Sequence, residues 1–159
     1  MLARALAPEI GPAPGAVLLR SDVERKVLFE REETEPLPED AYAPEVTARV
    51  YATITAKARR AVAAGHSAIV DAVFARPDER TTVEDTAKTL GAPFRGLFLE
   101  ADLATRLART GSRSADASDA DAAVARAQDD YDLGAMHWTR IDASDTPDET
   151  LKWAKAALE

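Results

Sequence analysis

Two acidic residues stand where predicted strands end, which is where an α/β protein binds its ligands. Asp71 directly follows residues 67–70, a short apolar run without alternation that is typical of a strand buried on both faces. Asp22 comes shortly after a second apolar run, at residues 16–19. Because ligands of open α/β sheets bind at the carboxyl ends of the strands, both acids are candidates for a binding site.

Arginines accompany both acids. Arg25 lies three residues after Asp22 on a predicted helix, so the two side chains share a face. The same spacing also fits a helix N-cap followed by an ion pair, and Asp71 also fits an acid that holds the next loop in place. Arg80 lies on the helix that Pro77 opens, and this position suits the wall of a cleft and an exposed surface equally well.

Residues 102–131 are predicted to form a helical hairpin that carries more arginines. The first helix begins at Asp102, buries Leu103 and Leu107, and has its arginines on a separate, polar side. Small residues at 110–118 break it before a second helix. The arginines are Arg106, Arg109, Arg113 and, on the second helix, Arg126. The alternative is a solvated helix face that pairs with the acids of the hairpin tip.

The hydrophobic pattern predicts short strands that alternate with helices. Strands are expected at 16–19, 67–70, 94–100 and 138–141, and helices at 2–10, 22–28, 44–64, 77–90, 102–110, 118–131 and from 147 onward. An acidic, proline-containing surface loop is expected at 30–42. Strands joined through helices run parallel, so the expected fold is a three-layer α/β/α sheet. The 159 residues are expected to form one domain.

The bulk composition excludes several classes of function. A net charge of −8 argues against a nucleic-acid duplex as a partner, because neutralising phosphates needs a basic surface. The absence of cysteine excludes disulfides and thiolate metal sites. No apolar run is long enough to span a membrane, and the N-terminus lacks a signal-peptide core. Together these features favour a cytoplasmic protein.

Taken in order, the motifs resemble those of P-loop kinases. The similarity is to the small-substrate branch that includes polynucleotide kinase, the zeta toxins and the chloramphenicol phosphotransferases, and above all to the ATP-binding domains fused to aminoglycoside phosphotransferase-like domains. The motifs that carry it are Arg20-Ser21-Asp22 with Arg25, the Ile69-Val70-Asp71 strand with Arg80 on the next helix, and the arginine-bearing hairpin. The resemblance covers nearly the whole chain.

The resemblance assigns a role to each candidate residue. It implies that Asp22 is the general base for a substrate hydroxyl and that Asp71 orients Mg²⁺ through its bound waters. Arg25 and Arg80 would bind the substrate. The hairpin would be a lid whose four arginines close over ATP. ATP and Mg²⁺ are thus the implied cofactors, and a nucleotide and a small molecule the implied ligands.

One part of the family pattern is absent from this sequence. Such kinases begin with a strand, a phosphate loop of the form Gly-x-x-x-x-Gly-Lys-Ser/Thr and a helix that often reads Leu-Ala-Arg-Ala-Leu-Ala, which here is residues 2–7. The loop occurs nowhere in the chain. Its amides and lysine would hold the β- and γ-phosphates, so turnover is not expected from this chain alone.

The strand before that loop would lie between the strands at 67–70 and 94–99 if the family topology holds. We therefore expect a gap in the sheet, a direct closure of those two strands, or a strand supplied by another chain or domain. The expected function is phosphate transfer from ATP to a small-molecule hydroxyl, impaired in the chain as given. The alternative is a non-catalytic module that binds a nucleotide or a protein partner.

Overall fold

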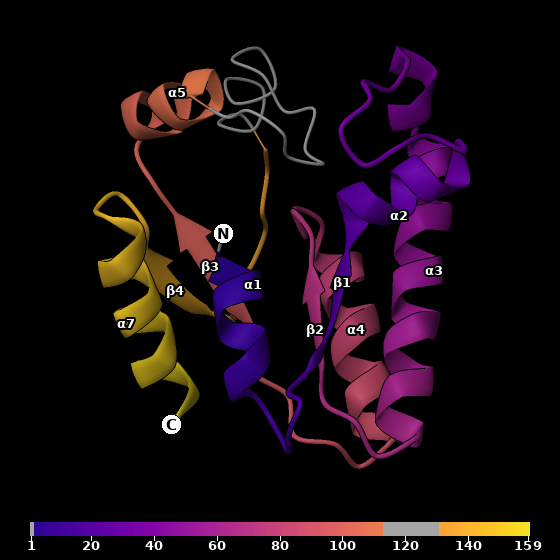
Figure 1. The fold of residues 1–159 in the computed structure, drawn as a ribbon, viewed down its shortest axis with the longest axis vertical. Coiled ribbons are helices and arrows are strands. Elements are labelled where there is room, and N and C mark those ends of the chain that lie inside the picture. The colour runs from indigo at the N-terminus through magenta and orange to yellow at the C-terminus, as the bar shows by residue number, and fades with distance from the viewer. Residues whose placement is uncertain (1, 113–130) are drawn as a thin grey trace.

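The computed structural model describes residues 2–112 and 131–159 of the chain, and in these it is an α/β protein with parallel strands. In chain order the elements are α1 (Leu2–Leu6), the 3-10 turn η1 (Ala7–Glu9), β1 (Val17–Arg20), α2 (Ser21–Leu28), η2 (Glu39–Tyr42), α3 (Pro44–Ala63), β2 (Ala68–Asp71), α4 (Pro77–Thr89), β3 (Leu97–Glu100), α5 (Leu103–Ser112), β4 (Thr139–Asp142) and α7 (Pro147–Leu158) (Figure 1). The predicted parallel α/β class is confirmed.

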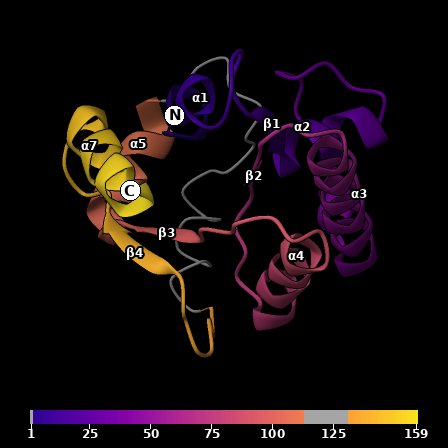
Figure 2. The same ribbon diagram turned by 90° about the horizontal axis from the view of Figure 1, so that it is seen from below.

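The strands pair two by two. β1 is hydrogen-bonded in parallel to β2, and β3 in parallel to β4. β2 and β3 face each other across the middle of the molecule in both views, yet no hydrogen-bonded ladder joins them within the described part of the chain (Figures 1 and 2). Of the three expected arrangements, direct closure of these two strands is therefore not the one formed.

The strands are unusually open for parallel strands, which are normally buried on both faces. Of the residues in the four described strands, Ile141 of β4 alone is buried, at 5% exposure, while Val17 and Leu99 are 40% and 45% exposed. Apolar side chains are buried instead on the helices: Val50 and Ile54 of α3 beside the β1–β2 pair, and Leu6 of α1 with Ala154 of α7 beside β4.

Aromatic side chains join the two strand pairs. Phe74, in the loop after β2, lies edge-on to Trp138, which precedes β4, with ring centroids 5.0 Å apart. Trp138 also contacts Phe94 and donates its indole N–H to Glu84 of α4. Such edge-to-face pairs add about 0.5–1.5 kcal/mol beyond area burial. This cluster holds together strands that share no ladder.

Gly96 leaves room for the Trp138 ring, which gives a first prediction. A Cβ at residue 96 would overlap Cγ, Cδ1 and Cδ2 of Trp138, atoms that are not the mobile end of a side chain. We expect Gly96→Ala to displace the indole and to lower the free energy of unfolding by about 2 kcal/mol, as overpacking does. Chemical denaturation followed by circular dichroism measures this, with Gly96→Ala in a Trp138→Ala background as the control, because the shortened side chain removes the clash. A loss no larger than that of the control would contradict it.

Most predicted boundaries are confirmed to within a few residues, and the departures have physical causes. The expected helix at 2–10 ends as α1 at Leu6, because Pro8 cannot continue the α-helical hydrogen bonding, and a 3-10 turn follows. β3 begins at Leu97 rather than at residue 94, after the glycine that lies against Trp138. Thr146 caps α7 as expected, by accepting the Glu149 N–H at 3.3 Å. The second arm of the predicted hairpin lies outside the described residues.

Within the described residues, no helix combines the length and the apolar character that a membrane span requires.

Candidate functional site

The carboxyl ends of β1 and β2 place the candidate acids at one edge of the molecule. Arg20, the last residue of β1, is in register with Asp71, the last residue of β2. The Arg20 Nε donates to Asp71 Oδ2 at 3.2 Å. Asp22 lies just beyond, in the first turn of α2. The parallel pairing thus brings Asp22 and Asp71 to the same edge, while the roles assigned to them stay predictions.

Glu33 extends this edge into a chain of charges. Its Oε1 lies 3.7 Å from Arg20 Nη1 and 3.9 Å from Arg4 Nη2 on α1. The Arg20 side chain is only 9% exposed, whereas those of Asp71 and Glu33 are 43% and 49% exposed. The acidic loop 30–42 therefore reaches the strand ends through a carboxylate and helps to neutralise a nearly buried arginine.

Asp22 and Arg25 are both on α2, and Asp22 does not have the N-cap position that the sequence also allowed. The helix begins at Ser21 and its N-cap is Arg20, so Asp22 is not the cap. Arg25 is 6% exposed, and its Nη1 donates to the carbonyl of Ala41 at 2.6 Å and to Thr47 Oγ1 at 3.2 Å. These bonds fix the loop before α3 against α2. The substrate-binding role of Arg25 stays a prediction.

Arg80 is a buried structural contact. It is 3% exposed, and its guanidinium donates to four carbonyls: those of Phe74 and Ala75 after β2, and those of Leu133 and Ala135 before β4. The four bonds tie the loop that follows Asp71 to the segment that follows the predicted lid. The substrate-binding role of Arg80 stays a prediction, because in this structure the guanidinium is engaged by these four carbonyls.

The two described lid arginines are anchored near the ends of β3 and β4. Arg106 Nε donates to the Ala101 carbonyl at 3.1 Å, and the Arg109 guanidinium donates to the carbonyls of Ala143 and Asp145. The Arg109 bonds fasten α5 to the turn after β4, while the Arg106 bond stays local to the start of α5. Arg113 and Arg126 lie outside the described residues, so the predicted clamp on ATP stays a prediction.

Two acids near the ends of β3 and β4, Asp102 and Asp142, accept hydrogen bonds from backbone amides. Asp102 Oδ1 accepts the Thr105 N–H at 2.7 Å at the start of α5, and this bond lowers the pKa of Asp102. Asp142 Oδ1 accepts the Ser144 N–H at 2.8 Å, which lowers the pKa of Asp142 in the same way. Both carboxylates are fully exposed and bind turn amides. At this end the two carboxylates act as caps.

The described residues do not by themselves fit Mg²⁺ and ATP. They contain no group of three potential metal ligands, and one oxygen of Asp71 already accepts the hydrogen bond from Arg20. The sequence has no phosphate loop to cradle the nucleotide. We therefore derive no chemical step through either group from these residues alone.

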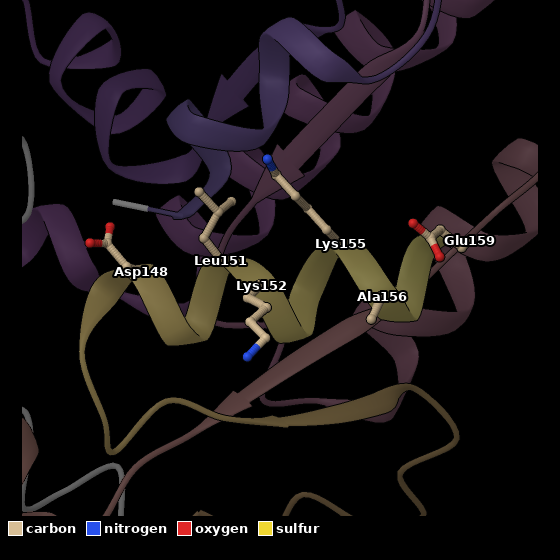
Figure 3. A pocket seen from close by; sticks show the side chains of 6 residues that line it. All are labelled: Asp148, Leu151, Lys152, Lys155, Ala156 and Glu159. Carbon is tan, nitrogen blue, oxygen red and sulfur yellow. The ribbon is translucent and has the colours of Figure 1, made fainter.

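One surface hollow lies on α7, away from these strand ends. It has a volume of about 480 Å³ and is lined by residues of α7 and the C-terminal Glu159 (Figure 3). Lys155 on its rim pairs with Glu9 of η1 at 2.7 Å, while Lys152 points elsewhere (Figure 3). With walls from one helix, it is an open helix face and does not define a binding site.

Two residues at the site had no role in the sequence-based prediction. Arg20 could have been found, because a cation that directly ends an apolar strand meets the next strand-end acid once the strands pair in parallel. Tyr51 gives no such signal, since in the sequence it only flanks the apolar positions Val50 and Ile54 of a helix. Its contacts with Phe74 depend on tertiary structure.

The described residues form an α/β protein with parallel strands, whose carboxyl ends carry the candidate acids. The family model described as AAA domain matches residues 1–132, and the chain belongs to this family. A gluconokinase from Sinorhizobium meliloti has 17% sequence identity and a TM-score of 0.62, with 99% of this chain and 82% of that chain covered. A sugar kinase from Janibacter has 16% identity and a TM-score of 0.62, with 99% and 85% covered. No curated protein matches the chain.

Proposed function

We propose that this fold serves an ATP-dependent phosphotransferase that acts on a hydroxyl of a small, polyhydroxylated molecule such as a sugar or a sugar acid. The observation that carries the proposal is the parallel register of β1 and β2, which brings Asp22 and Asp71 to one edge in a chain of the AAA domain family. The gluconokinase and sugar kinase with the same fold support the substrate class. Fold likeness alone does not fix a substrate, so the acceptor is tested directly.

In this proposal Asp22 accepts the proton of the acceptor hydroxyl, and Asp71 holds water on the nucleotide side. Arg25 and Arg80 shape the acceptor site, and the lid arginines neutralise charge on the phosphates. ATP supplies the phosphoryl group when it is bound. The residues of the chain orient the acceptor and take up its proton.

We further propose that a fifth parallel strand belongs between β2 and β3, and that the loop after it cradles the phosphates. Two observations support this. β2 and β3 share no ladder although they face each other, and the Leu99 side chain of β3 is 45% exposed. A strand in this place would join the two pairs into one sheet. Without it, the 159-residue chain is expected to transfer phosphate poorly or not at all.

A gain-of-function assay tests this proposal. The chain is compared with a fusion in which an apolar strand and a Gly-x-x-x-x-Gly-Lys-Ser loop precede Leu2, using labelled ATP, Mg²⁺ and D-gluconate or D-glucose. We expect the fusion to be more stable thermally and to transfer label, and the same fusion with the loop lysine changed to alanine not to. A fusion that is stabilised yet transfers no label to either acceptor would rule out the proposed reaction for these two acceptors.

A second prediction concerns the proposed base. In the active fusion, Asp22→Asn removes the proton acceptor and is expected to lower kcat at least about 100-fold. Asp78→Asn is the control, because that carboxylate is exposed and pairs only with Arg76, at 2.9 Å, among the described residues. Equal rates for the two variants would contradict the role of Asp22. Circular dichroism checks that both remain folded.

The alternative is a non-catalytic module, and one observation favours it. Asp71 is already paired with Arg20, whose guanidinium also faces Glu33, so the Asp71 carboxylate has a cationic partner without a ligand. The melting temperature of the 159-residue chain, measured with and without millimolar Mg-ATP, shows whether the chain binds the nucleotide. No shift, together with stabilisation as the protein concentration rises, would favour a module that binds other protein chains.

A further inference from the structure

Tyr51 of α3 has a hydroxyl that is held in place by a backbone donor. Its ring lies edge-on to Phe74, with centroids 5.4 Å apart and planes at 89°. The Phe74 N–H donates to the Tyr51 hydroxyl oxygen at 3.0 Å. Phe74 thus makes both the ring contact and the hydrogen bond. Together they fix the position of the Tyr51 phenol and the direction from which its oxygen accepts a hydrogen bond.

The backbone conformation that aims this N–H is a strained one. Phe74 has a φ of 48°, in the left-handed region that residues other than glycine rarely adopt, and it is 4% exposed. Such a conformation costs about 1–3 kcal/mol and persists only where the surroundings impose it. Here the rings of Tyr51 and Trp138 do so from two sides. Strain of this kind concentrates at functional sites, which prompts the question of what the fixed hydroxyl serves.

The hydroxyl proton is available for a ligand. Because the oxygen accepts from Phe74, its own O–H must point in another direction, and it finds no acceptor within residues 2–112 and 131–159. A phenol is both a donor and an acceptor, and a largely buried O–H normally has a partner. The donor half of Tyr51 is thus the half that the described protein leaves unused.

The charges around Tyr51 are those of the proposed acceptor site. Burial raises the pKa of Tyr51 to about 12; the Phe74 amide and Arg25 lower it, and the carboxylates of Glu79 and Asp22 raise it. The phenol therefore stays protonated, and able to donate, at any physiological pH. The geometry places Tyr51 on the side of α2: Arg25 donates to Thr47 Oγ1 at 3.2 Å, and Thr47 lies one turn before Tyr51 on the same face of α3. Asp22 lies on α2 three residues before Arg25, so Tyr51 is on the side of α3 that faces the helix with the proposed base.

We propose that Tyr51 is a substrate-binding residue whose hydroxyl donates a hydrogen bond to an oxygen of a polyhydroxylated acceptor lying beside Asp22 and Arg25. This rests on the proposed function for the class of acceptor. The Phe74 N–H and the ring contact fix the donor before the ligand arrives, so little conformational freedom is lost on binding. Tyr51 would therefore select for an oxygen at one position of the acceptor.

The test measures binding of D-gluconate and D-glucose to the 159-residue chain by calorimetry, without any need for turnover. Tyr51→Phe removes the hydroxyl and keeps the ring, and is expected to weaken binding of the better probe about 5- to 10-fold, the usual range for one lost hydrogen bond. Thr53→Val is the matched control, because within the described residues this hydroxyl on the same helix bonds only to the Arg49 carbonyl, at 2.8 Å. Circular dichroism shows whether each variant is folded.

The outcomes separate this inference from the proposed function. Equal affinity of Tyr51→Phe and the unaltered protein would overturn the role of Tyr51, as would the absence of binding by the unaltered protein up to about 10 mM, an affinity of a few kcal/mol. Weaker binding by Tyr51→Phe alone supports it. If that weakening is found but the stabilised fusion transfers no label from ATP, the proposed reaction fails while the binding role of Tyr51 stands.

Discussion

Arg80→Leu is expected to lower the free energy of unfolding by about 4 kcal/mol, a large share of the 5–15 kcal/mol that typically holds a domain together. The guanidinium is 3% exposed and donates to four carbonyls from two separate segments. Leucine fills part of the space but leaves those carbonyls without their donor. A buried acceptor that loses its partner costs about 1–3 kcal/mol, and the four do not add fully because the loops can relax toward water.

The size of this effect follows from what Arg80 joins. Phe74 and Ala75 lead out of β2, and Leu133 and Ala135 lead toward β4, so the side chain acts between strand pairs that share no ladder. Arg80→Lys keeps the charge but has one ammonium group in place of a planar fork. It cannot reach both segments with the same geometry, and we expect a loss of about 2 kcal/mol.

Urea denaturation followed by far-ultraviolet circular dichroism measures both variants. The control is Arg76→Leu, because Arg76 lies just before α4 and its side chain pairs with exposed Asp78 at 2.9 Å. An exposed pair of this kind contributes at most about 1 kcal/mol. If Arg80→Leu were no more destabilising than Arg76→Leu, the four carbonyl bonds would not be holding the strand pairs together.

Gly15→Val is expected to prevent stable folding, with a loss of about 5 kcal/mol. Gly15 has a φ of 109°, and a Cβ there would overlap the Ala7 carbonyl oxygen and lie 2.7 Å from Pro8 Cα. Those atoms are backbone, so they cannot swing aside as the end of a side chain does. A β-branched residue therefore suffers a conformational penalty and a steric clash together, and losses of this size arise from such combinations.

Gly65→Val is the matched control for this prediction. Gly65 also has a positive φ, of 86°, but nothing lies within 4 Å of a Cβ built on it. The difference between the two variants in urea denaturation thus isolates the clash with the η1 backbone from the cost of the conformation, which is about 1–2 kcal/mol. Equal losses would mean that the turn before β1 moves freely away from η1.

The elements that could be predicted from sequence are those with strong local signals. α3 follows from its opening proline and the four-residue spacing of Val50, Ile54 and Ala58, and α7 follows from its Thr146 cap. The pairing of strands into two separate ladders could not be predicted, because it depends on which edges meet in space. The early end of α1 was predictable in principle, since Pro8 is visible in the sequence.

The sequence predicts that the acids of the candidate site lie at one edge of the sheet, but it does not predict which groups the arginines of the site contact. Parallel pairing brings strand-end acids together, which is why Asp22 and Asp71 lie on the same side. The partners of Arg25 and Arg80 are main-chain carbonyls from loops distant in sequence, and a carbonyl carries no signature of residue type. The roles of all these residues await the assays above.

The short helix α1 belongs to one end of the chain by sequence and to the other by contact. It packs on α7 beside β3 and β4, and Glu9 of the following turn pairs with Lys155 (Figure 1). Residues 2–9 thus pack against the last helix before the backbone crosses to β1. Trimming the start of this polypeptide would therefore unseat its final helix, although some 140 residues separate the two in sequence.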